Sequence, residues 1–496
     1  MTRRETRTAA HVRRSSPSRR AWARRSTAAV LGGVLALVGC DEEPDPAAEE
    51  PPPEETSPEN GVLDARDDEA VGVSSDPCPD AVDEELGCIR LGALVDRTDE
   101  RVSAISEQHL EAQRGFWTRV NEAGGVGGYE IHLADHVRDV TDDPQEQVTA
   151  VEELAEEVLA FALLPGDATS AEAADLLVAE RLPAALPGWW SGWHAEGYRP
   201  TLLLPAEHSR CLAATAGLDW YAAAAEPPLT VLAVAHEPGG DDAEDDDEPT
   251  EAEAEDDEAA EAGQTARGRV RDDLAAGAQA WTEISEAQWL GVTTTGMLDD
   301  GDLQDAAVAA IVEQAPDVVV LGTGPRETGE LVSKAAARGF EGTFLGTLDT
   351  WVPGLLDDPE QAQALQALYR HLGPWDAPSP DVAAHAAMGA VRDDEAPLEQ
   401  AYLTGWVAAY PLLAALRAAV EGEELDREGL HAVLEEVEVD YEGVLPPRRL
   451  GALSAPARVV VSTPDAEVDG GLRTEGVVDD APGLEALDHP HGCAPA

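Results

Sequence analysis

The sequence has little positive charge. Its 496 residues contain 33 Lys and Arg against 99 Asp and Glu, which gives a formal net charge of −66 at pH 7. Lys334 is the single lysine. Because phosphate binding needs clustered basic side chains, this balance excludes nucleic acid as a partner. A lysine-dependent mechanism would have one candidate residue.

Phenylalanine and long apolar runs are also scarce. There are 4 Phe and 7 Tyr against 11 Trp, and no apolar run beyond residue 39 reaches the roughly 18 residues of a membrane-spanning helix. The hydrophobic content of 43% is nevertheless sufficient for a core. The length predicts two or three domains.

The basic residues gather at the N-terminus. Nine arginines lie within the first 25 residues and precede the apolar run 27–39, TAAVLGGVLALVG. As a helix this run spans about 20 Å, too short for the bilayer core of about 30 Å. Basic residues followed by a short apolar run are typical of an export signal, so we expect residues 1–39 to be a signal peptide. The motif Ser18-Arg19-Arg20 leaves twin-arginine export open beside the general route.

The end of the apolar run, Leu37-Val38-Gly39-Cys40, resembles the lipobox of bacterial lipoproteins. The resemblance implies lipidation of Cys40 and an extracytoplasmic protein held to a bacterial membrane. An ordinary signal peptide with a chance cysteine is the alternative.

Acidic segments flank and interrupt the rest of the chain. Residues 40–77 are rich in Asp, Glu and Pro, and we expect a disordered tether there. In residues 241–261, 14 of 21 residues are acidic, which predicts a disordered insertion. Calcium binding is the weaker interpretation, because the spaced Asp/Asn and turn Gly of a preformed loop are missing. Residues 476–496 are expected to form a C-terminal tail.

Four cysteines remain after Cys40, namely Cys78, Cys88, Cys211 and Cys493. An even number of cysteines is typical of an exported protein with disulfides. Four cysteines can be joined into two disulfides in three ways. We favour Cys78–Cys88 with Cys211–Cys493. No CxxC spacing occurs, so we expect neither a zinc site nor another cofactor.

Apolar runs alternate with helical patterns along the chain. This βαβ order predicts an α/β fold of parallel sheets with helices on both faces, which bind ligands at the carboxyl ends of the strands. The expected strands are 89–95, 129–137, 159–164, 182–186, 229–236, 289–294, 317–321 and 343–345. The expected helices of the first half are 103–121, 145–158 and 170–180.

Three stretches carry a family resemblance. They are IRLGALVDRTDE with VNEAGGVGG, then DDPQEQVTAVEELAEE with LLPGDATSAEAADLLVAERLPAALPGWW, and APDVVVLGTGPRETGELVSKAAARGFEGTFLGT. Together they resemble type I periplasmic solute-binding proteins, the branch that includes the branched-chain amino acid receptors of ABC transporters. The resemblance implies two Rossmann-like lobes joined by a hinge of several crossovers. We expect lobe 1 at 88–204 plus 350–452 and lobe 2 at 205–349 plus 453–475.

The resemblance also implies where a ligand binds. Its contacts would come from loops at strand ends, and the N-terminus of the helix from residue 170 suits an anion. Thr169 and Ser170 are equally suited to binding a ligand and to capping that helix. Trp189 and Trp190 suit stacking on a ligand or packing at a lobe edge. The candidate ligand-binding residues are Gly166, Asp167, Thr169, Ser170, Trp189, Trp190, Ser191, Thr323 and Asp349. Among them, the resemblance makes Asp349 the candidate for holding a ligand's ammonium group.

Catalytic motifs are missing. The spacing after Gly322 fails the GxGxxG pattern, and neither a P-loop, HExxH nor GxSxG occurs. We therefore expect no enzyme, but a monomeric lipid-anchored solute-binding protein that captures an amino acid, amide or related ligand for an ABC permease. A ligand-sensing or structural surface lipoprotein on the same fold is the alternative.

Overall fold

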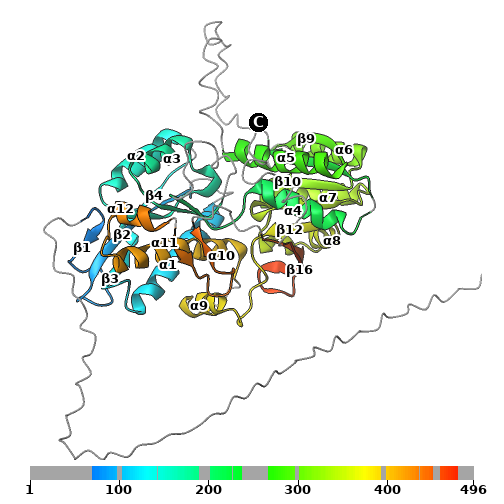
Figure 1. Ribbon diagram of the computed structural model, residues 1–496. Helices are drawn as coiled ribbons and strands as arrows, with labels where there is room; N and C mark the ends of the chain where they lie inside the picture. Colours follow the sequence, from blue (N-terminus) through cyan, green and yellow to red (C-terminus); the bar gives the residue numbers. More distant parts are fainter. Residues whose placement is uncertain are drawn as a thin grey trace, which may run out of the picture. The chain divides into compact units, whose positions relative to one another are not determined.

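Two sheets of seven strands each form the framework of the computed structural model (Figure 1). The structure describes residues 70–97, 103–141, 143–188, 202–225, 227–236, 266–296, 301–392, 398–434, 436–450 and 458–478. The predictions that fall outside the described residues are the signal peptide, Cys40, most of the tether, the insertion 241–261, Trp189, Trp190, Ser191 and Cys493.

The first sheet is built on the long central strand β2 (Gly87–Val95). From β2 the sheet continues in parallel through β5 (Ala160–Leu163), β6 (Ala184–Leu186) and β7 (Leu203–Pro205). On its other side, β3 (Tyr129–His132) and β4 (Val137–Asp139) pair with successive halves of β2. The short strand β1 (Val73–Ser74) pairs with β2 in the antiparallel direction.

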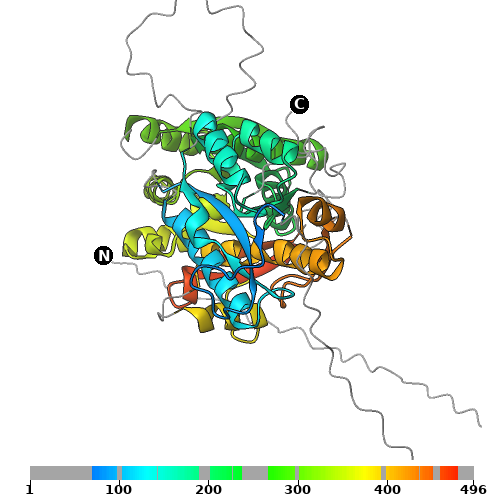
Figure 2. The ribbon, with the colours of Figure 1, turned by 90° about the vertical axis from the view of Figure 1, so that its left-hand side faces the viewer.

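Successive side chains of β2 enter two different cores, as the period of a strand requires. Ile89, Leu91 and Ala93 pack in the larger core with α1 (Ser103–Glu122) and the late helices, whereas Leu94 packs with α2 (Pro144–Ala155) and α3 (Ala171–Ala179). The late helices are α9 (Ala383–Val391), α10 (Gln400–Val407), α11 (Ala409–Glu421) and α12 (Arg427–Leu434). Figures 1 and 2 show the orange helices α10 to α12 beside the blue and cyan elements of the first half.

The segment 400–421, which contains α10 and α11, is a long apolar helical part of the described chain. By length and composition alone it is long enough to cross a membrane, but 78% of its most apolar window is buried inside the protein. Trp406, Leu412 and Leu416 belong to the larger core of the first sheet. Its apolar character is therefore that of a core helix that is covered on nearly all sides.

The second sheet has the order β16-β15-β12-β11-β10-β8-β9. Its strands are β8 (Thr230–His236), β9 (Gln288–Thr295), β10 (Val318–Gly322), β11 (Thr343–Gly346), β12 (Tyr369–Gly373), β15 (Val459–Pro464) and β16 (Leu472–Val478). The five strands from β9 to β12 run parallel, while β15 and β16 join in antiparallel pairs. A third, two-stranded sheet pairs β13 (Glu438–Val439) with β14 (Arg448–Arg449).

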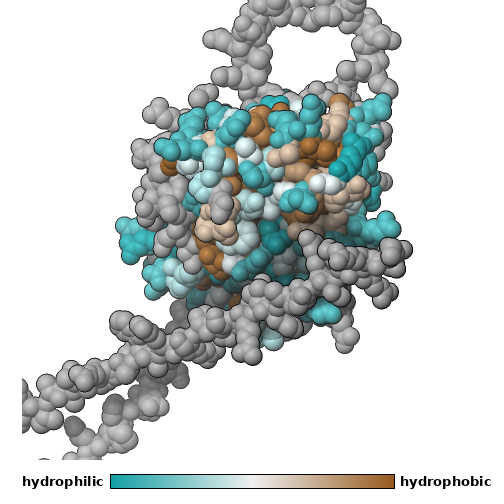
Figure 3. All heavy atoms as spheres, turned by 90° about the vertical axis from the view of Figure 1, so that its right-hand side faces the viewer, coloured by the Kyte–Doolittle hydropathy of each residue, from teal (hydrophilic) through white to brown (hydrophobic). Residues whose placement is uncertain are grey.

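Helices cover both faces of this second sheet. Val231 and Val318 pack with α4 (Arg210–Ala222) and α5 (Ala266–Ser285), whereas their neighbours Leu232 and Val319 pack with the helices of the opposite face. Those helices are α6 (Gly301–Gln314), α7 (Pro325–Ala337) and α8 (Pro359–Leu368). Figure 3 shows the side of α6 to α8 as a mixture of hydrophilic and apolar surface.

The expected α/β class is confirmed, but four boundaries differ. The strand expected over 129–137 is split into β3 and β4 by a turn of 3₁₀ helix at Ala134–His136. Residues 70–77, which were expected in the tether, belong to the described structure, and Val73 pairs with Ile89 of β2. β12 belongs to the second sheet, although 350–452 was assigned to the first lobe. β16 continues to Val478, which shortens the expected tail, and its antiparallel pairing was not predicted.

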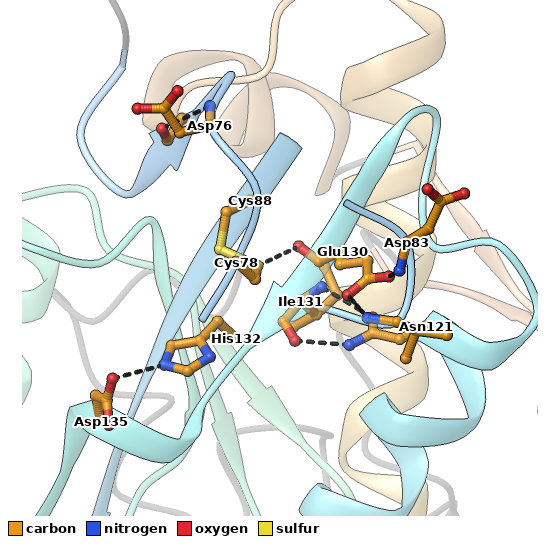
Figure 4. The surroundings of a disulfide bond; sticks show 11 residues. Asp76, Cys78, Asp83, Cys88, Asn121, Glu130, Ile131, His132 and Asp135 are labelled. Carbon is orange, nitrogen blue, oxygen red and sulfur yellow. Dashed lines mark hydrogen bonds and ion pairs between the residues drawn. A yellow bond between two sulfur atoms is a disulfide. The ribbon is translucent and has the colours of Figure 1, made fainter. Parts of the chain in front are cut away.

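The N-terminal margin of the first sheet is held by a disulfide (Figure 4). Cys78 and Cys88 are bonded, as predicted. This bond closes a loop that contains Val82 and Asp83. The buried carboxylate of Glu130, on β3, accepts hydrogen bonds from the backbone N–H groups of Val82 at 2.9 Å and Asp83 at 2.7 Å. Cys211 is disulfide-bonded too, while Cys493, its expected partner, lies outside the described residues.

Candidate functional site

Buried polar residues stand at the carboxyl ends of four neighbouring strands of the second sheet. His236 ends β8, Thr295 ends β9, Thr323 directly follows β10, and Thr347 directly follows β11. Parallel sheets with helices on both faces bind ligands at this edge. This row of side chains therefore marks the second sheet's part of a candidate site.

Two of these residues fasten the turn between β10 and α7. The Nε2 atom of His236 accepts a hydrogen bond from the backbone N–H of Gly324 at 3.1 Å. The hydroxyls of Thr323 and Thr328 lie 2.7 Å apart. Thr323, predicted to contact a ligand, thus lies at the expected strand end with its hydroxyl bonded to the first turn of α7.

A buried ion-pair cluster lies beside this row. Arg210, in the first turn of α4, is only 3% exposed and contacts two carboxylates. Its Nη1 donates to Oε1 of Glu207 at 2.8 Å, and its Nε donates to Oδ2 of Asp349 at 2.9 Å. Glu207 is itself 1% exposed. Since a buried charge needs a partner, the three groups form one electrostatic unit that joins the segment after β7 to the loop after β11.

Three buried histidines feel the charge of the same guanidinium. Burial is the main cause that lowers the pKa of His109 to about 3, of His208 to about 4 and of His371 to about 3. The positive charge of Arg210 lowers all three pKa values further, and the neighbouring His208 contributes to the shift at His371. All three imidazoles are therefore neutral at pH 7.

These histidines come from separate parts of the chain. His109 lies on α1 of the first sheet's core, His208 on the segment between β7 and α4, and His371 on β12. The Nε2 atoms of His109 and His371 are buried without a hydrogen-bond partner among the described residues. Buried polar atoms normally have partners, so unsatisfied nitrogens at such a place indicate a binding position.

The expected loop of the first sheet lies where β5 ends. Gly166, with a left-handed φ of 64°, begins a turn of 3₁₀ helix (Gly166–Ala168) and packs against Gly188, which follows β6. This turn also contacts α5, a helix of the second sheet. The loops after β5 and β6 are thus adjacent, as the two parts of one site must be. Asp167 lies within the turn.

Ser170 has the capping role that the sequence left open. Its Oγ accepts a hydrogen bond from the backbone N–H of Ala173 at 3.1 Å, which makes it the N-cap of α3. Its own N–H donates to Oε1 of Gln147 at 2.7 Å. Thr169 is fully buried beside it. The helix cap therefore uses the Ser170 side chain, and Gln147 fixes the loop to α2.

The sequence did not point to Glu207, His208, Arg210 or His371. One observation could have found the first three. The run EHSR follows the apolar segment LLLPA directly, so it lies at the carboxyl end of a strand. No sequence feature indicated a role for His371 or His109, because a histidine inside an apolar strand or helix is indistinguishable from an ordinary core residue.

Comparison with known proteins concerns the fold of the chain. Residues 259–463 match the family model described as periplasmic binding protein. No curated protein matches the sequence. Similar solved structures include a fatty acid ABC transporter substrate-binding protein from Thermomonospora curvata, with 19% identity, a TM-score of 0.67, and coverage of 86% of this chain and 98% of that one.

Two further structures have the same architecture. A solute-binding protein of an ABC transporter from R. palustris, in complex with benzoate, shares 13% identity at a TM-score of 0.59, covering 80% of this chain and 99% of that one. A putative branched-chain amino acid ABC transporter from Rhodospirillum rubrum shares 16% identity at a TM-score of 0.50, covering 78% and 99%. The expected resemblance is confirmed: the chain has the periplasmic binding protein type I fold, and its residues 259–463 match the periplasmic binding protein family.

Proposed function

We propose that the protein is an extracytoplasmic solute-binding protein that captures a small ligand at the strand ends of its two sheets and delivers it to an ABC permease. The observation that carries the proposal is the row of buried polar residues at the carboxyl ends of β8 to β11, in a fold with this architecture. Closure of two α/β lobes about crossovers buries a ligand and creates the surface that a permease recognises.

The ion pair between Arg210 and Asp349 bears on the class of ligand. Asp349 was the candidate for holding a ligand's ammonium group, but Oδ2 of its carboxylate already lies 2.9 Å from Nε and 2.8 Å from Nη2 of Arg210. A paired carboxylate attracts a second cation more weakly. We therefore favour a small carboxylic acid or amide over a zwitterionic amino acid, in keeping with the fatty acid and benzoate named for the similar proteins.

The remaining contacts of the proposed site come from the first sheet's loops. Gly166, Asp167, Thr169 and Ser170 would surround the ligand's polar group beside the N-terminus of α3. Trp189, Trp190 and Ser191 follow the end of β6 by three to five residues and would cover the ligand's apolar part. Thr323 would contact the ligand from the second sheet.

A thermal-shift screen of the full-length protein tests this function. The ligands are amino acids, their amides, aromatic acids and short fatty acids. A ligand at 100 times its dissociation constant stabilises the folded state by about 2.7 kcal/mol, which is a measurable shift in melting temperature. Trp189→Ala should weaken any ligand found. If no class shifts the melting temperature, transport is contradicted and the surface-lipoprotein alternative is favoured.

The membrane anchor is a separate part of the proposal. Lipidation of Cys40 would hold the protein outside the cytoplasmic membrane at the end of the acidic tether. Incorporation of a labelled fatty acid into the wild-type protein, and its loss in Cys40→Ser, tests the anchor without reference to any ligand. An unlabelled wild-type protein would contradict lipidation and leave the ligand proposal intact.

A further inference from the structure

Arg210 binds two carboxylates that differ in exposure. The side chain of Glu207 is 1% exposed, whereas that of Asp349 is 35% exposed. Removing the partner of a buried charge is costly, but a carboxylate near the surface regains its hydration when it leaves an ion pair. Glu207 is therefore the permanent counter-ion of the guanidinium, and Asp349 is the one that can be exchanged.

Asp349 uses only part of what the guanidinium offers. The Nε and Nη2 atoms of Arg210 lie 2.9 and 2.8 Å from the same oxygen, Oδ2. The Nε–Nη2 edge of a guanidinium fits a carboxylate best when each nitrogen donates to an oxygen of its own. A carboxylate that is free to orient itself can therefore bind this edge in a stronger arrangement than the tethered Asp349 does.

The turn that carries Asp349 is fixed independently of this ion pair. The backbone N–H of Thr350 donates to the carbonyl of Thr347 at 3.0 Å, and Oγ1 of Thr350 donates to the same oxygen at 2.6 Å. The hydroxyls of Thr350 and Tyr369 lie 2.6 Å apart. Rotation about the Cα–Cβ bond of Asp349 can therefore move its carboxylate into solvent while the turn stays in place.

The ion pair lies at the candidate site. Asp349 stands three residues after the end of β11 in the second sheet, and Arg210 stands five residues after the end of β7 in the first. Cys211 donates its backbone N–H to Asp273 of α5 at 3.0 Å, and the turn Gly166–Ala168 contacts the same helix. The pair thus connects the carboxyl ends of strands from both sheets, where the ligand is proposed to bind.

We propose that the Asp349 carboxylate occupies the place of a ligand's carboxylate, and that a bound ligand displaces it from the Nε–Nη2 edge of Arg210. This inference rests on the proposed function and narrows the ligand to a carboxylic acid. One carboxylate replaces another, so Arg210 keeps two acidic partners in both states. The internal carboxylate also sets a threshold, because a small anion must compete with a tethered group at high effective concentration. A ligand with an apolar body adds contacts that a small anion lacks.

The first test asks whether a carboxylate from solvent reaches Arg210, and it needs no transported solute. Asp349→Ala removes the internal carboxylate from the full-length protein, and melting is measured in sodium acetate, sodium chloride and acetamide. We expect acetate to raise the melting temperature of Asp349→Ala by about 1–2 °C more than that of the wild type, with no such effect of chloride or acetamide. Asp357→Ala is the matched control, because Asp357 is exposed and lies eight residues further along. The absence of an acetate effect specific to Asp349→Ala overturns the proposal.

The second test measures the competition by calorimetry with benzoate and benzamide. Asp349→Asn keeps the shape of the side chain but lacks the charge that competes for Arg210. We expect this variant to bind benzoate about tenfold more tightly than the wild type does, although the substitution lowers stability. Benzamide carries no charge, so its affinity should change by less than about twofold, and Asp357→Asn should alter neither affinity. Equal or weaker benzoate binding by Asp349→Asn shows that the ion pair is a permanent contact and overturns the proposal.

Arg210→Lys is the complementary variant. It keeps a positive charge beside Glu207 but lacks the two-donor edge, so benzoate should bind about tenfold more weakly than to the wild type, and unchanged affinity contradicts the role of Arg210. The proposed function fails in a different way. If neither benzoate nor octanoate binds to the wild type or to Asp349→Asn, while acetate still stabilises Asp349→Ala, transport of a carboxylic acid is contradicted and the exchangeable position at Arg210 is retained.

Discussion

Arg210 holds Asp349 by a single carboxylate oxygen. Its Nε and Nη2 atoms lie 2.9 and 2.8 Å from Oδ2, while its Nη1 atom is bonded to Glu207. The residue that the sequence suggested as a partner for a ligand's ammonium group is thus already bonded to a cation of the protein. Four predictions concern this cluster, the disulfide loop and two helix glycines.

Loss of the Arg210 guanidinium should destabilise the fold strongly. Arg210→Met leaves the carboxylate of Glu207 buried without its cationic partner, and removal of one member of a buried pair costs about 3–5 kcal/mol. Asp349→Asn should cost about 1 kcal/mol, because the Asp349 side chain is 35% exposed. Urea unfolding of both variants measures the difference. Equal losses would show that Glu207 does not depend on Arg210.

Stability should fall on acidification below pH 6.5. His109, His208 and His371 have folded-state pKa values of about 3 to 4, against an ordinary value of 6.5. Between these values the unfolded chain binds protons that the folded protein does not, so the free energy of unfolding rises with pH up to about 6.5 and is lost as pH falls towards 4. Each histidine contributes a slope of up to about 1.4 kcal/mol per pH unit.

Chemical denaturation between pH 7.5 and 4.5 measures this slope. His208→Asn removes one of the three titrating imidazoles, so the variant should lose up to about 1.4 kcal/mol per pH unit of the wild-type slope. An unchanged slope would mean that His208 is accessible to protons in the folded state.

The carboxylate of Glu130 should stabilise the disulfide loop. Glu130→Ala removes the acceptor of two backbone N–H groups, those of Val82 and Asp83, and should cost roughly 1–3 kcal/mol. Hydrogen exchange at these two amides should accelerate in the same variant. Glu85→Ala is the control within the loop, since Glu85 is exposed and should change stability by less than about 0.5 kcal/mol. Unaltered exchange at residues 82 and 83 would contradict the role of Glu130.

Two glycines should respond in opposite ways to alanine. A Cβ at Gly405 on α10 would lie 2.6 Å from Cα of His109 on α1, so Gly405→Ala must push the two helices apart and should cost about 1–3 kcal/mol. Gly389, on the exposed side of α9, has open space at its Cβ position, and Gly389→Ala should stabilise by about 0.5–1 kcal/mol. Thermal unfolding of the two variants compares them, and a stable Gly405→Ala protein would contradict the close helix contact.

Local patterns predicted most of the framework. The strands β2, β5, β8 and β10 and the helices α1 to α3 lie within a few residues of their expected positions, because alternating and helical spacing of apolar residues reflects which faces they bury. The Cys78–Cys88 bond was predictable from the sequence for a similar reason, since the two cysteines are separated by only ten positions. The pairing of β12 with β15 was not predictable, because it joins His371 to Ser462, which are distant in the chain.

The sequence by itself determined the α/β class, the order of the elements and the strand ends at which Gly166, Thr323 and Asp349 lie. Only the tertiary structure decided that Arg210 neutralises Asp349, that Ser170 caps α3, and that His109, His208 and His371 share one buried environment. The physical reason is that burial and charge pairing depend on neighbours in space. His109 and His371 are 262 positions apart, and only the packing of α1 near the crossover segments places both beside the same guanidinium.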